Sequence, residues 1–343
     1  MNNDVLFMSR ALELAALGRG HVSPNPLVGC VIVHNHRIIG EGWHRQYGGP
    51  HAEVNAVRSI ADESLLAEST VYVTLEPCSH FGKTPPCADL LIEKKVKKVV
   101  VCNEDPNPLV AGKGLAKLRA AGIEVETGLL AERGRELNRR FFTFIEKKRP
   151  YLILKWAETA DGFLAPADFR PMPISGSLSR QLVHQWRTQE DAILVGTNTA
   201  RHDNPQLNVR LWSGRNPVRI VIDRHLQLPA SLHLFDGSQP TLVYATVPVP
   251  ETAGATTFIQ LDSEAPFLPQ LVADLYQRKI QSVIVEGGAV LLESVLRQQL
   301  WDEVRIFKST TILGEGLAAP ALRGRLTSTK QVGEDWLMTY QPI

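Results

Sequence analysis

The hydrophobic positions near the N-terminus follow a helical period. Val5, Met8, Leu12 and Ala15 recur at three- to four-residue intervals, so the chain is expected to open with an amphipathic helix. Two apolar runs follow, at 27–33 and 37–43, and a polar turn separates them. Runs of this length around a short polar turn predict two paired strands.

Beyond residue 50 the chain alternates between helical and strand-like patterns. The stretch 51–60 has helical spacing, and the run 70–77 predicts a strand that ends at a proline, with Cys78 opening the next helix. A further strand is expected within 95–102, and 114–128 predicts a helix, a terminating glycine and a strand. Strands and helices in alternation favour an α/β sandwich with a mixed sheet.

A charged run from Glu146 to Arg149, followed by Pro150, predicts a boundary between two domains, 1–146 and 150–343. The alternation then starts again. Strands are expected at 151–156, 192–196, 218–223, 241–245 and 282–285, and helices at 179–187 and 289–298. The second domain is therefore also predicted to be α/β.

Composition narrows the functional classes. The 343 residues suit two domains, and 37 basic against 36 acidic residues argue against the broad basic surface that nucleic-acid binding needs. No apolar run has the length of a membrane span, and the N-terminus lacks the layout of a signal peptide, so we expect a cytoplasmic protein without a membrane partner. The oligomeric state stays open, with a homo-oligomer among the alternatives.

The four cysteines, Cys30, Cys78, Cys87 and Cys102, are too few for a disulfide scaffold in a chain of this length. Cys30 and Cys102 fall within apolar strands, where we expect them to pack in the core. For the other two cysteines, metal binding is the better hypothesis in a reducing compartment.

His51, Cys78 and Cys87 together have the residue types and the number of ligands typical of a catalytic zinc site. Glu53 stands two residues after the histidine, and the order H-x-E followed by P-C is typical of zinc-dependent deaminases of bases. In such a site the carboxylate carries protons and does not bind the metal. Eight residues separate the two cysteines instead of the usual two, and the glycine and prolines among them suit a loop.

A second site is indicated in the C-terminal half. No G-x-G-x-x-G fingerprint occurs, but Gly287 and Gly288 follow an apolar strand and precede a helix, an arrangement that lets backbone amides approach a phosphate. Lys155, Asp203 and Glu286 are placed at or after strand ends, where the sites of α/β proteins gather. We expect these three to orient substrate and transfer protons. An exposed strand lysine and an Asx-turn at Asp203 are the alternatives.

Several motifs resemble one known family, the bifunctional deaminase/reductases of riboflavin biosynthesis. They are SPNPLVGCVIV, GGPHAEVNA and TLEPCSHFGKTPPCADLLIE in the first half, and LKWAETADGFLA and VIVEGGAVLLESVL in the second. The long gap between the cysteines is itself a mark of that family, and the resemblance covers essentially the whole chain. It implies an N-terminal cytidine-deaminase-like α/β/α sandwich and a C-terminal dihydrofolate-reductase-like domain.

The resemblance also implies two successive reactions. The first is zinc-dependent hydrolytic deamination of 2,5-diamino-6-ribosylamino-4(3H)-pyrimidinone 5′-phosphate, with His51, Cys78 and Cys87 holding Zn²⁺ and Glu53 carrying protons. The second is NADPH-dependent reduction of the ribosyl chain to ribityl.

Further site residues follow from the resemblance alone. Substrate contacts of the deaminase are expected at Asn25, His44, His80 and Lys83. Substrate contacts of the reductase are expected at Arg187, Leu207, Arg210 and Glu286. Contacts to NADPH are expected at Ala157, Thr199, Asp203, Arg224, Gly287 and Gly288. The chain departs from the family in the segment 163–176, which carries Pro171 and Pro173, and in KSTTILGEG near residue 312, so the reductase loops are expected to differ.

Two other functions fit parts of the pattern. One is a zinc deaminase of another base, a nucleoside or an RNA adenosine, joined to a C-terminal module that is not a reductase. The neutral charge balance argues against RNA, and the long gap between the cysteines argues against all three substrates. The other is an inactive scaffold that keeps zinc for folding, and Glu53 argues against it because a structural zinc site needs no such carboxylate.

Overall fold

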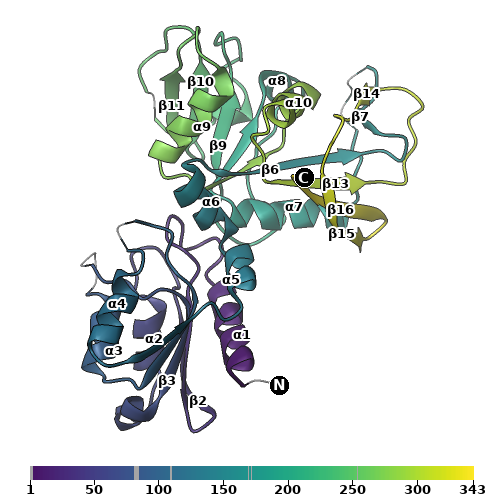
Figure 1. Ribbon diagram of the computed structural model, residues 1–343. Helices are drawn as coiled ribbons and strands as arrows, with labels where there is room; N and C mark the ends of the chain where they lie inside the picture. The colour runs from purple at the N-terminus through teal and green to yellow at the C-terminus, as the bar shows by residue number, and fades with distance from the viewer. Residues whose placement is uncertain (1–2, 81–84, 109, 169, 171, 253) are drawn as a thin grey trace. The chain divides into compact units, whose positions relative to one another are not determined.

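The computed structural model describes residues 3–80, 85–108, 110–168, 170, 172–252 and 254–343. Within the described chain, contacts divide the residues into two compact units, Met1–Lys148 and Arg149–Ile343. The division falls inside the charged run that precedes Pro150. Figure 1 shows both units.

The first unit is built on a mixed sheet, as the sequence predicted. The strand order is β2-β1-β3-β4-β5, and the strands are β1 (Gly29–His34), β2 (Arg37–Trp43), β3 (Thr70–Leu75), β4 (Lys98–Asn103) and β5 (Glu124–Thr127). β1 is antiparallel to both β2 and β3, whereas β3, β4 and β5 are parallel. The first strand begins at Gly29, two residues later than predicted.

Helices cover both faces of this sheet (Figure 1), which makes the unit an α/β/α sandwich. One face packs against α1 (Asn3–Ala16), and the opposite face packs against α2 (Ala52–Arg58), α3 (Cys87–Glu93) and α4 (Lys113–Ala120). The remaining helical segments are η1 (Glu63–Glu68), α5 (Ala131–Leu137) and α6 (Arg139–Lys147). The predicted helical stripe in α1 is buried at Met8, Leu12 and Ala15 but not at Val5, and Cys30 and Cys102 lie in the core as expected.

One local prediction was wrong. Cys78 does not open a helix but lies in the loop after β3, and α3 begins at Cys87. Pro85 and Pro86 explain the difference, because a proline ring cannot continue a helix that has already started, whereas a proline is tolerated at a helix start. Pro86 is the N-cap residue of α3. The loop thus separates the two cysteines in sequence, and α3 starts on the second.

The second unit contains a larger sheet in the order β11-β10-β9-β8-β12-β6-β13-β16-β15. Its strands are β6 (Tyr151–Glu158), β8 (Ala192–Val195), β9 (Val218–Ile222), β10 (Thr241–Ala245), β11 (Thr256–Gln260), β12 (Ser282–Val285), β13 (Glu303–Lys308), β15 (Arg325–Val332) and β16 (Asp335–Gln341). The strands from β11 to β13 run parallel, and β16 and β15 add an antiparallel edge. A small separate pair joins β7 (Phe163–Ala165) to β14 (Leu317–Ala318).

Helices also cover both faces of the larger sheet (Figure 1). α9 (Phe267–Gln277) and α10 (Ala289–Arg297) pack on one face, and α7 (Ser177–Gln189) and α8 (Thr197–Asp203) on the other. A short helical turn, η2 (His233–Phe235), precedes β10. No helix among the residues that the structure describes is long and apolar enough to cross a membrane.

Candidate active sites

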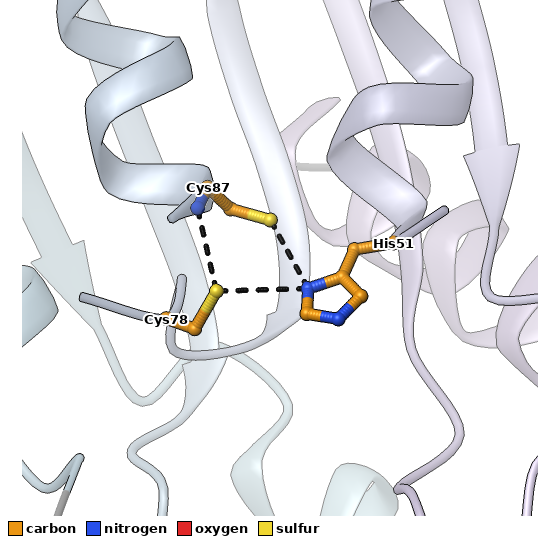
Figure 2. A group of neighbouring side chains, drawn as sticks. All are labelled: His51, Cys78 and Cys87. Atoms are coloured by element: carbon orange, nitrogen blue, oxygen red, sulfur yellow. Dashed lines mark hydrogen bonds between the residues drawn. The ribbon is translucent and has the colours of Figure 1, made fainter. Parts of the chain in front are cut away.

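Three side chains of the first unit converge at one end of its sheet (Figure 2). His51 is the N-cap residue of α2, Cys78 lies in the loop after β3, and Cys87 is the first residue of α3. The Nδ1 atom of His51 is 3.2 Å from Sγ of Cys87 and 3.6 Å from Sγ of Cys78. The backbone N–H of Cys87 also donates to Sγ of Cys78 at 3.3 Å. The predicted trio is therefore brought together.

The geometry of this trio fits a zinc ion. Its donor atoms all lie within 4.8 Å of one another. A tetrahedral ion with Zn–S near 2.3 Å and Zn–N near 2.1 Å requires N···S separations of about 3.6 Å. The separation of 3.6 Å to Cys78 matches that value, and the separation of 3.2 Å to Cys87 is slightly shorter. A ring nitrogen and two thiolates are also the donor set that zinc prefers.

Tight packing under α2 fixes where its histidine and glutamate lie. Gly42 on β2 faces this helix so closely that a Cβ atom there would lie 2.3 Å from the amide nitrogen of Ala56 and 2.5 Å from the carbonyl oxygen of Ala52. Only glycine fits such an approach. α2 can therefore sit directly on the strand, with its N-terminal residues at the metal-binding trio.

The loop after β3 is held by a carboxylate that was not predicted from the sequence. Glu76 is 4% exposed, and its oxygens accept the backbone N–H groups of Gly114 at 2.9 Å, Gly112 at 3.0 Å and Asp105 at 3.3 Å. Glu76 thus ties the segment that carries Cys78 to the loop between β4 and α4.

Glu53 lies beside the trio, in the first turn of α2, and is 3% exposed. Burial, helped by negative charge on Cys78, raises the pKa of Glu53 to about 7. The Cys87 thiol, His51 and the backbone N–H of Cys87 donate hydrogen bonds that, against burial, lower the pKa of Cys78 to about 4. The site thus places a thiolate next to a carboxyl group that can hold or release a proton.

His44 and Asn25, both expected to contact substrate, contact each other. Nδ1 of His44 lies 3.0 Å from the carbonyl oxygen of Pro50, so this nitrogen carries the hydrogen, and Nε2 accepts from Nδ2 of Asn25 at 3.1 Å. Burial lowers the pKa of His44, which keeps the ring neutral. The ring also packs edge-on against His51. The two predicted substrate contacts are therefore held as a unit next to the metal-binding trio.

The other two predicted contacts of the deaminase lie in the segment between the cysteines. His80 is exposed. Burial raises the pKa of Asp105 to about 6, and the interaction of Asp105 with His80 opposes that rise. Lys83 lies outside the described residues.

In the second unit, Lys155, Arg187 and Glu286 form a buried charged cluster. Glu286 follows β12, and both of its oxygens accept from Arg187 of α7, at 3.0 and 2.8 Å. Nζ of Lys155, on the neighbouring strand β6, is 4.0 Å from Glu286. Burial favours a high pKa for Glu286, but the charges of Arg187 and Lys155 outweigh it and lower the value to about 2. Burial lowers the pKa of Lys155, against the attraction of Glu286.

The segment after α8 joins this cluster. Nη1 of Arg187 donates to the carbonyl oxygen of Asn208 at 3.0 Å, and the backbone N–H of Arg210 donates to Nδ1 of His184 at 3.3 Å. His184 was not predicted. Burial and the charges of Arg187 and Arg210 lower its pKa to about 4, so it is neutral and accepts at Nδ1. Leu207, also predicted, is buried in this segment.

Three of the predicted cofactor contacts, Gly287, Gly288 and Thr199, follow the ends of the parallel strands β12 and β8. Gly288 is the N-cap residue of α10, and a Cβ atom on it would lie 3.2 Å from Oγ1 of Thr199, so these two expected contacts are neighbours. A Cβ on Gly287 would meet Leu291 at 2.8 Å. Close packing against Leu291 therefore favours glycine at 287, and contact of the glycine pair with a phosphate stays a prediction.

Three further predicted residues lie apart from one another. Ala157 lies on β6 and packs into the core on the face covered by α7 and α8. The Arg224 guanidinium lies 4.5 Å from the centre of the Phe267 ring. Asp203 was expected in a loop after a strand but is the last residue of α8. The residue as a whole is exposed, but its carboxyl group is partly buried, and this burial raises the pKa of Asp203.

Comparison with known proteins finds one family match within each of the two units. Residues 1–103 match the cytidine and deoxycytidylate deaminase zinc-binding region, and residues 150–338 match the RibD C-terminal domain. These matches confirm the expected fold class, a cytidine-deaminase-like sandwich and a dihydrofolate-reductase-like domain.

The full chain also matches whole proteins. It is 41% identical to the riboflavin biosynthesis protein RibD of Actinobacillus pleuropneumoniae, over 99% of this chain and 96% of that protein. It is 38% identical to RibD of Aquifex aeolicus, over 98% of each. The crystal structure of a diaminohydroxyphosphoribosylaminopyrimidine deaminase/5-amino-6-(5-phosphoribosylamino)uracil reductase from Thermotoga maritima superposes with a TM-score of 0.92 at 38% identity, covering 99% of each chain. With this identity along nearly its whole length, the chain belongs to the RibD family of riboflavin biosynthesis proteins.

Proposed function

We propose that this chain catalyses two successive steps of riboflavin biosynthesis. Its first unit deaminates 2,5-diamino-6-ribosylamino-4(3H)-pyrimidinone 5′-phosphate, and its second unit reduces the ribosyl chain of the product to ribityl with NADPH. The observation that carries the proposal is the convergence of His51, Cys78 and Cys87, with Glu53 beside them and not among the ligands. Membership of the RibD family supports the identity of both reactions.

In the deaminase, His51, Cys78 and Cys87 would hold zinc, which when bound supplies a Lewis acid that promotes ionisation of water at neutral pH. Glu53 takes one proton from the attacking water and gives it to the ring nitrogen; it then takes the second proton from the added hydroxyl group and gives it to the amino group, which leaves as ammonia while the carbonyl forms. Its burial suits this role, because a carboxyl group with a pKa near the working pH can both accept and release a proton.

The pyrimidinone would be oriented by Asn25, which the neutral His44 holds in place. Lys83 and His80 are proposed to contact the substrate from the segment between the cysteines. A lysine suits a phosphate as a point charge.

In the reductase, NADPH when bound supplies the hydride for C1′ of the ring-opened sugar. Lys155 and Asp203 are proposed to handle the protons of ring opening and reduction. Glu286 binds substrate and keeps Arg187 and Lys155 in place through their ion pairs. Arg187, Arg210 and the backbone at Leu207 would hold the substrate, because arginine suits bidentate phosphate contacts.

The cofactor itself would lie along the strand ends. Gly287 and Gly288 open the start of α10 to the cofactor phosphates, with Thr199 beside them. Ala157, Asp203 and Arg224 complete the proposed cofactor contacts.

We assign the deaminase to residues 1–146 and the reductase to residues 150–343, and we place the reaction in the cytoplasm, where free thiols stay reduced. A homo-oligomer is our working assumption, and sedimentation equilibrium tests it.

The experiment is a coupled assay with purified protein, the diaminopyrimidinone phosphate and NADPH, in which ammonia release and NADPH oxidation are followed together. We expect equal amounts of ammonia released and NADPH consumed. Glu53→Ala should stop ammonia release but still oxidise NADPH when given the deaminated compound, and Asp203→Ala should do the reverse. Loss of both activities in either variant would contradict two independent sites, and ammonia release from cytidine or guanine instead would favour the other class of zinc deaminase.

A further inference from the structure

Three consecutive carbonyl groups in the segment after α8 are each held by a buried side chain. The oxygen of Gln206 accepts from Nε of Arg219 at 3.0 Å, that of Leu207 from Nε2 of Gln239 at 3.4 Å, and that of Asn208 from Nη1 of Arg187 at 3.0 Å. We call residues 204–210 the clamped loop. Arg187 also binds Glu286, so the loop is joined directly to the proposed reductase site.

The backbone of the clamped loop is strained at its centre. Leu207 has a φ of 52° and Asn204 a φ of 38°, both in the left-handed region. Asparagine tolerates this conformation, whereas a leucine there is unfavourable, because its Cβ comes too close to the following carbonyl oxygen. Such a conformation persists only where the surroundings over-determine it, and it is concentrated at functional sites. The three hydrogen bonds to carbonyl oxygens hold the clamped loop in this conformation.

Arg219 is an unusual residue for the position it occupies. It lies on β9 inside the sheet and is 0% exposed, which is costly for a charged side chain without good partners. Beyond Gln206, its guanidinium donates to Asp236 at 2.7 Å, to Ser238 at 3.0 Å and to the carbonyl oxygen of His233 at 2.9 Å. One arginine thus links the clamped loop to the segment 233–238.

That second segment also contacts the clamped loop directly. The backbone N–H of His233 donates to Oδ1 of Asn204 at 2.8 Å, and Nδ1 of its ring lies 3.0 Å from the carbonyl oxygen of Asn204. Gln239 follows this segment, is 5% exposed, and donates to the oxygens of Leu207 and Pro217. Its Oε1 is buried without a partner among the described residues. An unsatisfied buried amide oxygen costs folding free energy, so we attribute the role of Gln239 to the hydrogen bonds that its Nε2 donates.

We propose that Arg219 and Gln239 are positioning residues of the reductase: from the side away from the substrate they hold the clamped loop in the strained shape that binds the sugar phosphate. Within the clamped loop, their hydrogen bonds go to the backbone carbonyl oxygens of Gln206 and Leu207. The proposal rests on the assignment of Arg187, Leu207 and Arg210 to substrate binding. It predicts that loosening either residue weakens binding of the phosphorylated substrate and leaves the cofactor and the chemical step little changed.

The test compares Arg219→Lys and Gln239→Met with the control Asp236→Asn in the full chain. Lysine keeps the charge near Asp236 but has no Nε–H for Gln206, and methionine keeps the bulk of Gln239 without its donor. Asp236→Asn weakens the ion pair that Arg219 makes through Nη1 and leaves the bond from Nε to Gln206. The measurements are kcat and the KM values for the deaminated substrate and NADPH, the substrate Kd by calorimetry without NADPH, and the thermal midpoint.

We expect Arg219→Lys and Gln239→Met to raise the substrate KM and Kd about tenfold, the loss expected for about 1.4 kcal/mol of binding free energy. The NADPH KM and the deaminase rate should stay within twofold. Asp236→Asn should lower the thermal midpoint without changing substrate Kd. If Arg219→Lys does not fold, Gln239→Met carries the test alone.

Wild-type Kd in a folded Gln239→Met protein would overturn the proposal, and so would an equal rise of Kd in Asp236→Asn, since the effect would then be one of stability. Failure of the proposed function looks different, because the wild-type protein itself would neither bind the deaminated compound nor oxidise NADPH with it.

Discussion

Replacing Glu286 by glutamine should move the pH dependence of the reductase in a defined direction. Nζ of Lys155 lies 4.0 Å from Glu286, and both side chains are largely buried, with 16% and 11% exposed. Burial and the charge of Arg187 lower the pKa of Lys155, and the charge of Glu286 raises it. Glu286→Gln removes the raising contribution, so the pKa of Lys155 falls further. If protonated Lys155 is required, activity is lost as pH rises through that pKa.

The magnitude follows from the separation of the charges. Two unit charges 4 Å apart interact by about 4 kcal/mol at an effective dielectric constant near 20. This figure is an upper bound, because water and neighbouring dipoles relax around the remaining lysine, and one pH unit corresponds to about 1.4 kcal/mol. We therefore expect the falling limb of kcat against pH to move to lower pH by roughly one to two units.

The assay is NADPH oxidation with saturating deaminated substrate, so that any weaker binding after loss of the Arg187 ion pair does not affect the result. Glu158→Gln is a matched control, because Glu158 is the last residue of β6, the strand that carries Lys155, and is mostly buried but contacts Trp156 and Lys308. Its profile should match the wild type. An unmoved limb in Glu286→Gln, or a limb moved to higher pH, would refute the assignment of Lys155 as the group that must be protonated.

Three further outcomes follow from the structure. Removal of zinc with a chelator should stop deamination, leave NADPH oxidation of the deaminated compound intact and be reversed by added zinc; loss of both activities would count against separate sites. Gly42→Ala should force α2 away from β2 and so lower both zinc affinity and stability, the latter by about 1–3 kcal/mol, measured by metal titration and urea unfolding. Glu76→Gln should cost about 1.5–3 kcal/mol of unfolding free energy through weaker bonds to the amides of Gly112 and Gly114, and an unchanged urea midpoint would contradict this.

The zinc site could be predicted from sequence because its chemistry is carried by residue type and order. Cysteine and histidine at these spacings have few other uses, and Glu53 lies only two residues from a ligand. The sequence did not predict two features of this site, the loop conformation at Cys78 and the contacts of Glu76. The prolines before Cys87 could have shown that Cys78 lies in a loop, but no local signal pointed to Glu76, whose partners lie beyond the next strand.

The reductase cluster was harder to predict because its members meet through strand order. Arg187 and Glu286 are 99 residues apart, and they meet because β12 inserts between β8 and β6. The hydrophobic periodicity of the sequence does not indicate which strands become neighbours in the sheet. α8 was missed for a different reason: among its residues only Ala200 is buried, so the helix shows no apolar stripe. His184 gave no sign either, since a histidine within a helix has no distinguishing neighbours in sequence.

The most direct test of the account is X-ray absorption at the zinc edge on the full-length protein, because deamination depends on His51, Cys78 and Cys87 sharing one ion while Glu53 stays free. We predict one zinc per chain with two sulfur ligands, one imidazole nitrogen and one further light atom, and the same shell in Glu53→Gln, which should be inactive as a deaminase. A shell without sulfur, or a shell that changes when Glu53 is replaced, would contradict it.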